Sequence, residues 1–157
     1  MSRLASTFAR LRETKTPGLV TYVTAGDPTL PRTRGVLEAL DRAGADVLEV
    51  GVPFSDPLAD GPVIQRATER ALASHTTLSG VLDLLGEMRG SLRPPVVIFS
   101  YANPILRLGA ERFADRAKEA GVDGVLVLDL PIEEADDFRN MLATRGIDTI
   151  LLLSPTT

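Results

Sequence analysis

Apolar residues occur along the chain in five short runs, and these runs predict the strands of a sheet. The predicted strands cover residues 18–25, 45–52, 95–102, 123–130 and 148–154. Most of the runs are continuous rather than alternating, as in Val125-Leu126-Val127-Leu128. Strands that are buried on both faces have this pattern, and parallel sheets bury both of their faces.

Helical spacing of apolar residues fills the stretches between the runs. Leu4, Phe8 and Leu11 predict a first helix within residues 1–13. Five further helices are predicted around Val36, Leu37 and Leu40; Val63, Ala67 and Ala71; Val81, Leu82, Leu85 and Met88; Phe113, Ala117 and Ala120; and Phe138, Met141 and Leu142. Strands and helices in alternation are typical of an α/β fold with a parallel sheet.

A short repeat of glycine, an aliphatic residue and aspartate precedes three of the strands. It ends at Asp46, Asp123 and Asp148, and the apolar run that follows stops in each case at a proline. The glycine suits the left-handed end of a helix, and the proline ends the strand. Since sites in α/β folds gather at the other end of the strands, we predict structural roles for these aspartates.

Two architectures fit this order of elements. A doubly wound, flavodoxin-like sheet of five strands would be complete in 157 residues, a length that suits one domain. A (β/α)8 TIM barrel typically needs ~250 residues, so residues 1–157 would form a single incomplete domain with about the first five βα units. Periodicity alone does not choose between the two.

Composition narrows the function classes. The chain has no cysteine and a formal charge of -4, which excludes disulfide scaffolds, thiol nucleophiles and zinc–thiolate sites and disfavours nucleic-acid binding. Its apolar stretches are shorter than the ~20 residues of a membrane span, and no signal-peptide core is present, so we expect a cytoplasmic protein. Phosphate-binding glycine motifs and HExxH-type metal motifs are absent, so we predict no metal ion and no bound nucleotide.

Glu49 is the most unusual residue among the predicted strands, because it lies within the apolar run at residues 47–52. A buried carboxyl loses hydration, which raises its pKa and suits it to general acid–base chemistry. Two plainer interpretations stay open: a glutamate that reaches water from an edge strand, or one that is neutralised by an arginine.

The loop at residues 53–62, with the sequence PFSDPLADGP, adds two more carboxylates. Asp56 and Asp60 are four residues apart and have no basic neighbour in the loop. Asx-turns or a helix N-cap would explain either aspartate structurally. Together with Glu49, however, Asp60 could form an acid–base pair that needs no metal or cofactor. His75, the only histidine, is predicted at a helix end.

Several of these segments together resemble the α subunit of tryptophan synthase. The resemblance rests on TAGDP at residues 24–28, LEVGVPFSDP at 48–57, LADGPVIQ at 58–65, YANP at 101–104 and GVDGVLVLDLP at 121–131. The PFSDPLADGP stretch is highly specific to that family. The match covers essentially the whole chain, although not the whole family domain.

The resemblance implies a TIM barrel that cleaves indole-3-glycerol phosphate to indole and glyceraldehyde 3-phosphate. Glu49 and Asp60 match the family's two catalytic acids. Tyr22, Tyr101, Leu126 and Leu128 would form the indole slot, with Tyr22 where the family is expected to have phenylalanine; Pro53, Asp56, Asn103 and Pro104 would face the β subunit. Indole would pass to that β subunit in an α2β2 heterotetramer, where pyridoxal phosphate resides, so this chain itself needs no cofactor.

The family domain carries three further strands, with a lid and phosphate-binding loops, beyond the point that corresponds to Thr157. Barrel phosphate sites are commonly built from those late loops, so we expect little or no turnover from these 157 residues alone. A non-catalytic module that binds the β subunit, and the complete flavodoxin-like domain, remain as alternatives.

Overall fold

The computed structural model describes residues 1–132 and 135–152. Its sheet has five parallel strands in the order β1-β2-β3-β4-β5. The strands are β1 (Val20–Thr24), β2 (Val47–Gly51), β3 (Val96–Ser100), β4 (Gly124–Val127) and β5 (Asp148–Ile150). A flavodoxin-like sheet has the order 2-1-3-4-5, so the sequential order excludes that alternative and is the order of a (β/α)8 barrel.

Seven helices are present in the described part of the chain. They are α1 (Arg3–Thr14), α2 (Leu30–Ala43), α3 (Pro62–Ala73), α4 (Leu78–Glu87), α5 (Ala102–Leu108), α6 (Ala110–Glu119) and α7 (Asp136–Thr144). Polar caps fix several boundaries: the Thr29 hydroxyl accepts from the Arg32 amide at the start of α2, and the Thr77 hydroxyl accepts from the Gly80 amide at the start of α4. Gly44 ends α2 with φ 93°, as the glycine repeat predicts.

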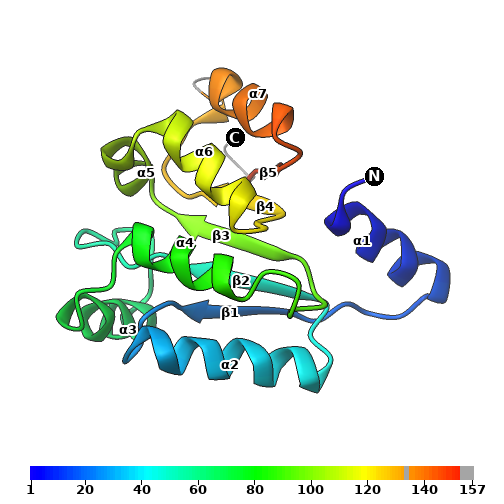
Figure 1. The fold of residues 1–157 in the computed structure, drawn as a ribbon, viewed down its shortest axis with the longest axis horizontal. Helices are drawn as coiled ribbons and strands as arrows, with labels where there is room; N and C mark the ends of the chain where they lie inside the picture. The colour runs from blue at the N-terminus through cyan, green and yellow to red at the C-terminus, as the bar shows by residue number, and fades with distance from the viewer. Residues whose placement is uncertain (133–134, 153–157) are drawn as a thin grey trace.

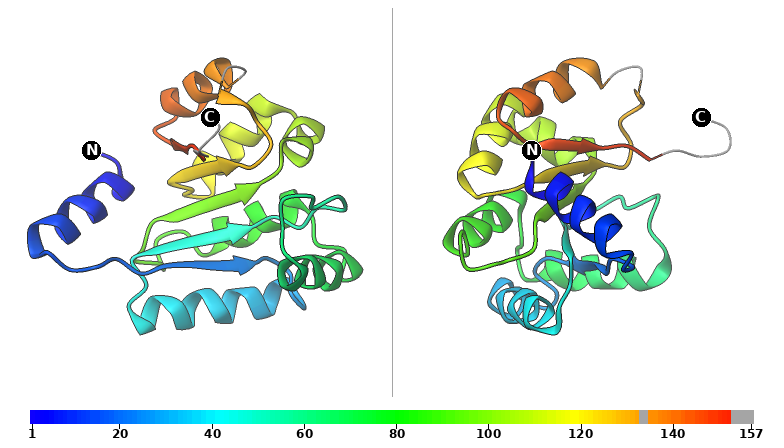
Figure 2. Two further views of the ribbon diagram at one scale, coloured as in Figure 1. Left: turned by 180° about the vertical axis from the view of Figure 1, so that it is seen from behind. Right: turned by 90° about the vertical axis from the view of Figure 1, so that its right-hand side faces the viewer.

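The two faces of the sheet differ in what covers them. On one face Leu48, Val50, Ile98 and Val125 are buried against the helices, in a core that also contains Phe113. The other face is not covered by the helices that connect the strands, as the view from behind shows (Figure 1, Figure 2). Tyr22 and Glu49 lie in register on this second face, which we call the inner face, and a smaller apolar cluster there contains Val47, Val97, Leu126 and, from α1, Leu4.

Helix α1 lies across the N-terminal ends of the strands, apart from the other helices (Figure 1). Its residues and its N-cap bond all three aspartates of the repeat. Ser2 donates to Asp148, Arg3 pairs with Asp123 at 2.9 Å, and Arg10 pairs with Asp46 at 2.6 Å. The predicted structural role of these aspartates is thus confirmed.

Several predicted boundaries were wrong. The third strand ends at Ser100 rather than residue 102, so Tyr101 is the N-cap of α5, and Asn103 and Pro104 belong to the first turn of that helix. Proline is tolerated in a first helical turn because its missing N–H would have no partner there. The fourth strand ends at Val127 rather than residue 130, and the predicted end of the fifth strand, 153–154, lies outside the described residues.

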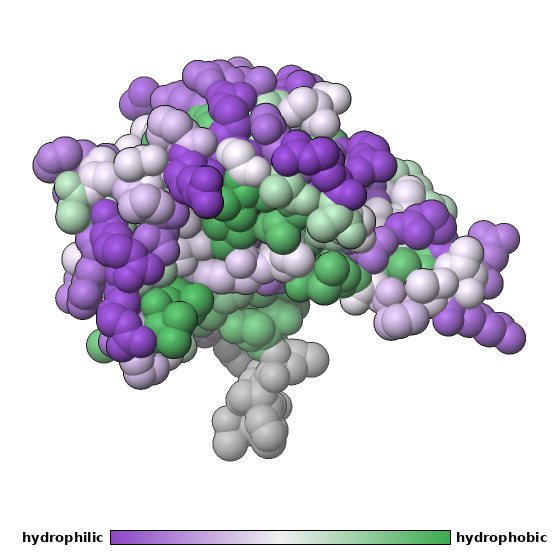
Figure 3. All heavy atoms as spheres, turned by 90° about the horizontal axis from the view of Figure 1, so that it is seen from below, coloured by the Kyte–Doolittle hydropathy of each residue, from purple (hydrophilic) through white to green (hydrophobic). Residues whose placement is uncertain are grey.

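Both outer strands of the sheet are paired on one side only within the described residues, since β1 contacts β2 and β5 contacts β4. Apolar side chains remain visible on the side of the molecule that carries β1 (Figure 3). Leu19 and Val20 are 52% and 45% exposed. In residues 1–132 and 135–152, no helix combines the length and apolarity that crossing a membrane requires.

Candidate active site

Glu49 lies in the middle of β2 with its side chain on the inner face. It is in register with Tyr22 of β1 and Val97 of β3, so it stands on a central strand and the edge-strand interpretation is wrong. Burial is the one cause of the pKa shift of this carboxyl, with no hydrogen bond or arginine acting on it among the described residues, which also removes the arginine interpretation. Burial raises the pKa of the Glu49 carboxyl above its ordinary value. The predicted electrostatic state of this residue is therefore confirmed.

An aromatic pair lies beside Glu49. The rings of Tyr22 and Phe99 meet edge to face, with centroids 5.2 Å apart and an interplanar angle of 77°. The phenol of Tyr22 lies against Gly51, where a Cβ atom would come within 2.1 Å of the tyrosine Oη. Burial raises the pKa of Tyr22, a Thr24 hydrogen bond opposes this rise, and the charges of Asp60 and Glu49 add to it. The negative charges of both acids therefore act on the hydroxyl of Tyr22.

Asp60 comes from the loop between β2 and α3, close to Tyr101. The Tyr101 hydroxyl donates to Asp60 Oδ2 at 3.2 Å and accepts from the Ala59 amide at 3.0 Å. The backbone of Asp60 is held as well: its amide donates to the Pro57 carbonyl at 3.1 Å, and Gln65 Nε2 donates to its carbonyl at 2.9 Å. The loop is thus fixed on both sides of the acid.

Leu126 and Leu128 extend the inner face beside the aromatic pair. Leu126 is in register with Phe99 and is buried, and Leu128 is partly buried in the same cluster. The structure therefore gathers five of the six predicted catalytic and slot residues, namely Tyr22, Glu49, Asp60, Leu126 and Leu128, on the inner face or beside it. Tyr101 is 5% exposed and reaches the group through Asp60.

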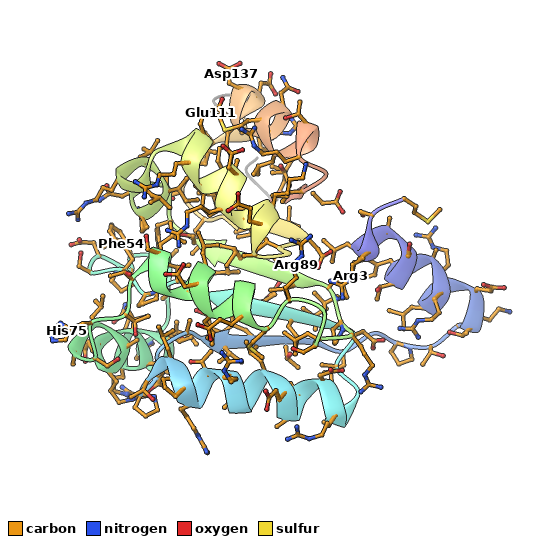
Figure 4. All side chains as sticks on the ribbon, viewed as in Figure 1. Arg3, Phe54, His75, Arg89, Glu111 and Asp137 are labelled. Atoms are coloured by element: carbon orange, nitrogen blue, oxygen red, sulfur yellow. The ribbon has the colours of Figure 1, made fainter. Side chains whose placement is uncertain are left out.

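The residues predicted to face a partner lie beyond the C-terminal ends of β2 and β3. Pro53 and Pro104 line one cavity of about 450 Å³, together with Phe54, which lies at this end of the sheet (Figure 4). Asp56 and Asn103 are exposed to solvent nearby. The four residues thus share one end of the molecule, where Asp56 and Asn103 are exposed, Pro104 is partly exposed and Pro53 is buried.

Other features lie apart from this group. His75 follows the end of α3 with φ 60° and an exposed side chain, as the sequence predicts for a helix end. A cavity of about 520 Å³ is at the opposite end of the strands around Arg3 and Arg89 (Figure 4). Across residues 1–132 and 135–152, no three acidic or histidine side chains are grouped to hold a metal ion.

Sequence reasoning missed Phe99 and Gly51. Gly51 and Phe99 are register partners on β2 and β3, and they lie two residues further along these strands than Glu49 and its partner Val97. All four therefore lie on the inner face, because alternate residues of a strand share a face. Residue parity along the strands contains this signal once the register is known. The completed arrangement offers one carboxyl with raised pKa, a second carboxylate on an anchored loop, and an edge-to-face aromatic pair, which together suit proton transfer to an aromatic ligand.

Comparison with known proteins gives a consistent result. A family model described as "Tryptophan synthase alpha chain" matches residues 8–157. The tryptophan synthase alpha chain of Geobacter sulfurreducens is 52% identical over 156 residues, covering 99% of this chain and 59% of the relative. That of Methylococcus capsulatus is 54% identical over 156 residues, covering 99% of this chain and 58% of the relative.

Solved structures agree. Tryptophan synthase subunit alpha from Legionella pneumophila superposes with a TM-score of 0.95 at 44% identity, over 100% of this chain and 60% of that one. A chain of the tryptophan synthase complex from Pyrococcus furiosus gives 0.84 at 42% identity, over 89% of this chain and 58% of that one. This chain therefore spans less than two thirds of each of these relatives, and the predicted barrel fold, represented by five βα units, is confirmed.

Proposed function

The chain belongs to the tryptophan synthase alpha chain family, and on this premise we propose that its inner face is the site of an aldol cleavage in tryptophan biosynthesis. The proposed substrate is indole-3-glycerol phosphate, and the products are indole and glyceraldehyde 3-phosphate. The observation that carries the proposal is the position of Glu49, an unpaired carboxyl with raised pKa that lies beside the Tyr22–Phe99 pair. The charges of Glu49 and of Asp60 both raise the pKa of the Tyr22 hydroxyl.

The cleavage needs two proton transfers and one site for positive charge. Glu49 in its protonated form, which burial favours by raising the pKa, would deliver a proton to indole C3 and place positive charge on the ring nitrogen. The Asp60 carboxylate would stabilise that charge by accepting a hydrogen bond from the ring N–H. Glu49, now ionised, would take the proton of the side-chain hydroxyl as the carbon–carbon bond breaks. The bond's electrons return to the ring, an aldehyde forms, and Glu49 ends protonated as it began.

The slot for the indole ring would come from the apolar part of the inner face. The edge-to-face pair of Tyr22 and Phe99 offers a ring surface, and Leu126 and Leu128 extend it on the neighbouring strand. The ring of Tyr101 would close the end nearest Asp60. An aromatic ring between such walls is held by burial and by ring–ring contacts, which leaves the two carboxylates free for chemistry.

We further propose that the partner is a β subunit that carries pyridoxal phosphate, in an α2β2 heterotetramer, and that this chain needs no cofactor of its own. The solved tryptophan synthase complex from Pyrococcus furiosus supports an assembly of this kind. Asp56, Asn103 and Pro104 would contribute to the contact from the surface at this end of the molecule, and Pro53, which is buried, would contribute through the cavity that it lines with Pro104.

A partial reaction tests the proposal on the chain itself. In D2O, a group that protonates and deprotonates indole C3 exchanges the C3 hydrogen for deuterium, and this exchange requires the slot and the two acids but no phosphate contact. We expect the chain to accelerate the loss of the C3–H NMR signal of indole, and Glu49→Gln to abolish the acceleration. Exchange at the solvent rate in the unsubstituted chain would contradict the proposed chemistry.

A module that binds the β subunit without catalysis is the second candidate, favoured by the cavity that Pro53 and Pro104 share with Phe54. The two functions separate in a single experiment with an added β subunit. Stimulation of the β reaction without indole C3 exchange supports the module. Exchange that depends on Glu49 supports the enzyme.

A further inference from the structure

The hydroxyl of Tyr101 makes two hydrogen bonds, both to the loop between β2 and α3. It accepts a hydrogen bond from the Ala59 amide at 3.0 Å and donates one to Asp60 Oδ2 at 3.2 Å. The residue is 5% exposed, so little of its ring is accessible to a ligand. A side chain whose role was only to line a slot would need neither of these bonds.

Tyr101 is held in place by a contact to its ring and by a backbone bond of the next residue. Phe54 packs against it with centroids 5.2 Å apart and an interplanar angle of 38°. The next residue, Ala102, donates its amide to Asp129 Oδ1 at 2.6 Å, which fixes the start of α5. The tyrosine oxygen is therefore presented to the loop from a rigid junction between β3 and α5.

The other bonds of Asp60 hold only its backbone. Its amide is bonded to the Pro57 carbonyl, and its carbonyl to Gln65 Nε2. These bonds place the Cα atom but leave rotation about the side-chain bonds free. Among the described residues, Tyr101 alone makes a hydrogen bond to the Asp60 carboxylate, and this bond selects one orientation of the carboxylate.

We propose that Tyr101 is a positioning residue that aims the Asp60 carboxylate at the reacting ring. The inference rests on the proposed function, since it assigns Tyr101 a role in that same site through Asp60. Its ring can still close one end of the slot, but its hydroxyl contributes to the chemistry by orienting the acid. Orientation of this kind affects the rate of proton transfer more than the binding of the ring.

The test is Tyr101→Phe, which removes the oxygen and keeps the ring. We expect the Ala59 amide to exchange with solvent about tenfold faster in NMR hydrogen exchange, because it loses its only recorded acceptor. The Asp60 amide, bonded to Pro57, serves as the internal reference and should change little. Indole C3 exchange should slow by about tenfold, while the dissociation constant for indole stays within about twofold.

The affinity measurement is direct, because the chain contains no tryptophan, so all indole fluorescence comes from the ligand and its change on binding can be followed. Tyr22→Phe is the matched control. It deletes the one other phenol hydroxyl of the chain, which has no recorded bond to the loop, so it should leave Ala59 amide exchange unchanged.

Three outcomes decide the inference. Unchanged Ala59 exchange in Tyr101→Phe overturns it, and so do equal losses of indole affinity and C3 exchange, which would indicate a slot wall. Faster Ala59 exchange with a selective loss of C3 exchange supports it. If the unsubstituted chain and Glu49→Gln exchange C3 at the same rate, the proposed function fails, and the Ala59 measurement still decides whether Tyr101 holds the loop.

Discussion

Replacing Arg3 by alanine should release α1 from the strand ends and destabilise the whole domain. Arg3 Nη1 donates to Asp123 Oδ2 at 2.9 Å. Its Nη2 donates to three carbonyls in the segment before β3, those of Leu92 at 3.1 Å, Arg93 at 2.8 Å and Pro94 at 3.0 Å. One guanidinium thus joins α1 to the start of β4 and to the segment that enters β3.

The magnitude follows from exposure. The side chains of Arg3 and Asp123 are 48% and 11% exposed, so the pair is neither a free surface contact nor a buried one. A surface pair alone contributes ~0.2–1 kcal/mol, and a bond to a charged donor ~1.5–3 kcal/mol when it is shielded. Asp123 keeps its bond from the Val96 amide at 2.8 Å. With the exposure discounted, we expect a loss of about 2 kcal/mol in the free energy of unfolding.

Urea unfolding followed by far-ultraviolet circular dichroism measures this loss. About 2 kcal/mol corresponds to a drop of roughly 4–8 °C in the melting temperature of a chain of this size. Arg12→Ala is the matched control on the same helix, because no side-chain bond of Arg12 is recorded in the described part of the chain. Arginine and alanine have similar helix propensities, so this control isolates the contacts of Arg3.

The pH dependence gives a second check. Burial raises the pKa of Asp123, and Arg3 opposes that rise. Without Arg3 the ionised carboxylate costs more at neutral pH, and protonation removes this cost as the pH falls through the folded-state pKa. The stability difference between the variant and the unsubstituted chain should therefore shrink in acid. If Arg3→Ala unfolds at the same urea concentration as Arg12→Ala at neutral pH, the conclusion that Arg3 stabilises the domain by holding α1 against the strand ends is refuted.

Three further predictions each concern a single residue. Because burial raises the pKa of Glu49, its ionised form lowers stability above that pKa, so Glu49→Gln should be the more stable chain in urea at about pH 8, with the difference vanishing towards about pH 4. Gly51→Ala places a Cβ 2.1 Å from Tyr22 Oη and should cost about 1–3 kcal/mol in urea unfolding and weaken indole binding measured by fluorescence. The Arg70 hydrogen bonds lower the pKa of Asp27, so Asp27→Asn should lower the melting temperature at neutral pH, a difference that disappears as the pH falls through that lowered pKa.

The alternation of elements could be predicted from the sequence because burial on two faces leaves a continuous apolar run, as at Val125–Leu128. The order of the strands could not, because periodicity shows which residues are buried but not which strands are neighbours. Residues 101 and 102 show a second limit. The aromatic and apolar character of Tyr101 and Ala102 extended the predicted strand to residue 102, whereas Tyr101 is the N-cap of α5 and Ala102 begins that helix.

The two acids of the candidate site could be predicted from the sequence, whereas the geometry of the site could not. Glu49 is conspicuous as a charge within an apolar run, and Asp60 as a carboxylate in a rigid loop. The contribution of Phe99 depends on register between strands, and the bond from Tyr101 to Asp60 joins residues that are far apart in the sequence. Neither leaves a local pattern, so only the folded chain shows them.

The aspartates at the N-terminal ends of the strands differ from Glu49, in the middle of β2, in whether their carboxylates have partners. At the N-terminal ends, Asp46 and Asp123 each accept both a backbone amide and an arginine of α1. Burial raises the pKa of both Asp123 and Glu49, so the direction of that shift does not separate the structural residue from the proposed catalytic one. The partners do. A carboxylate that is already bonded twice is committed to holding the fold, whereas Glu49, with no recorded partner in the described part of the chain, is free to exchange a proton with a ligand.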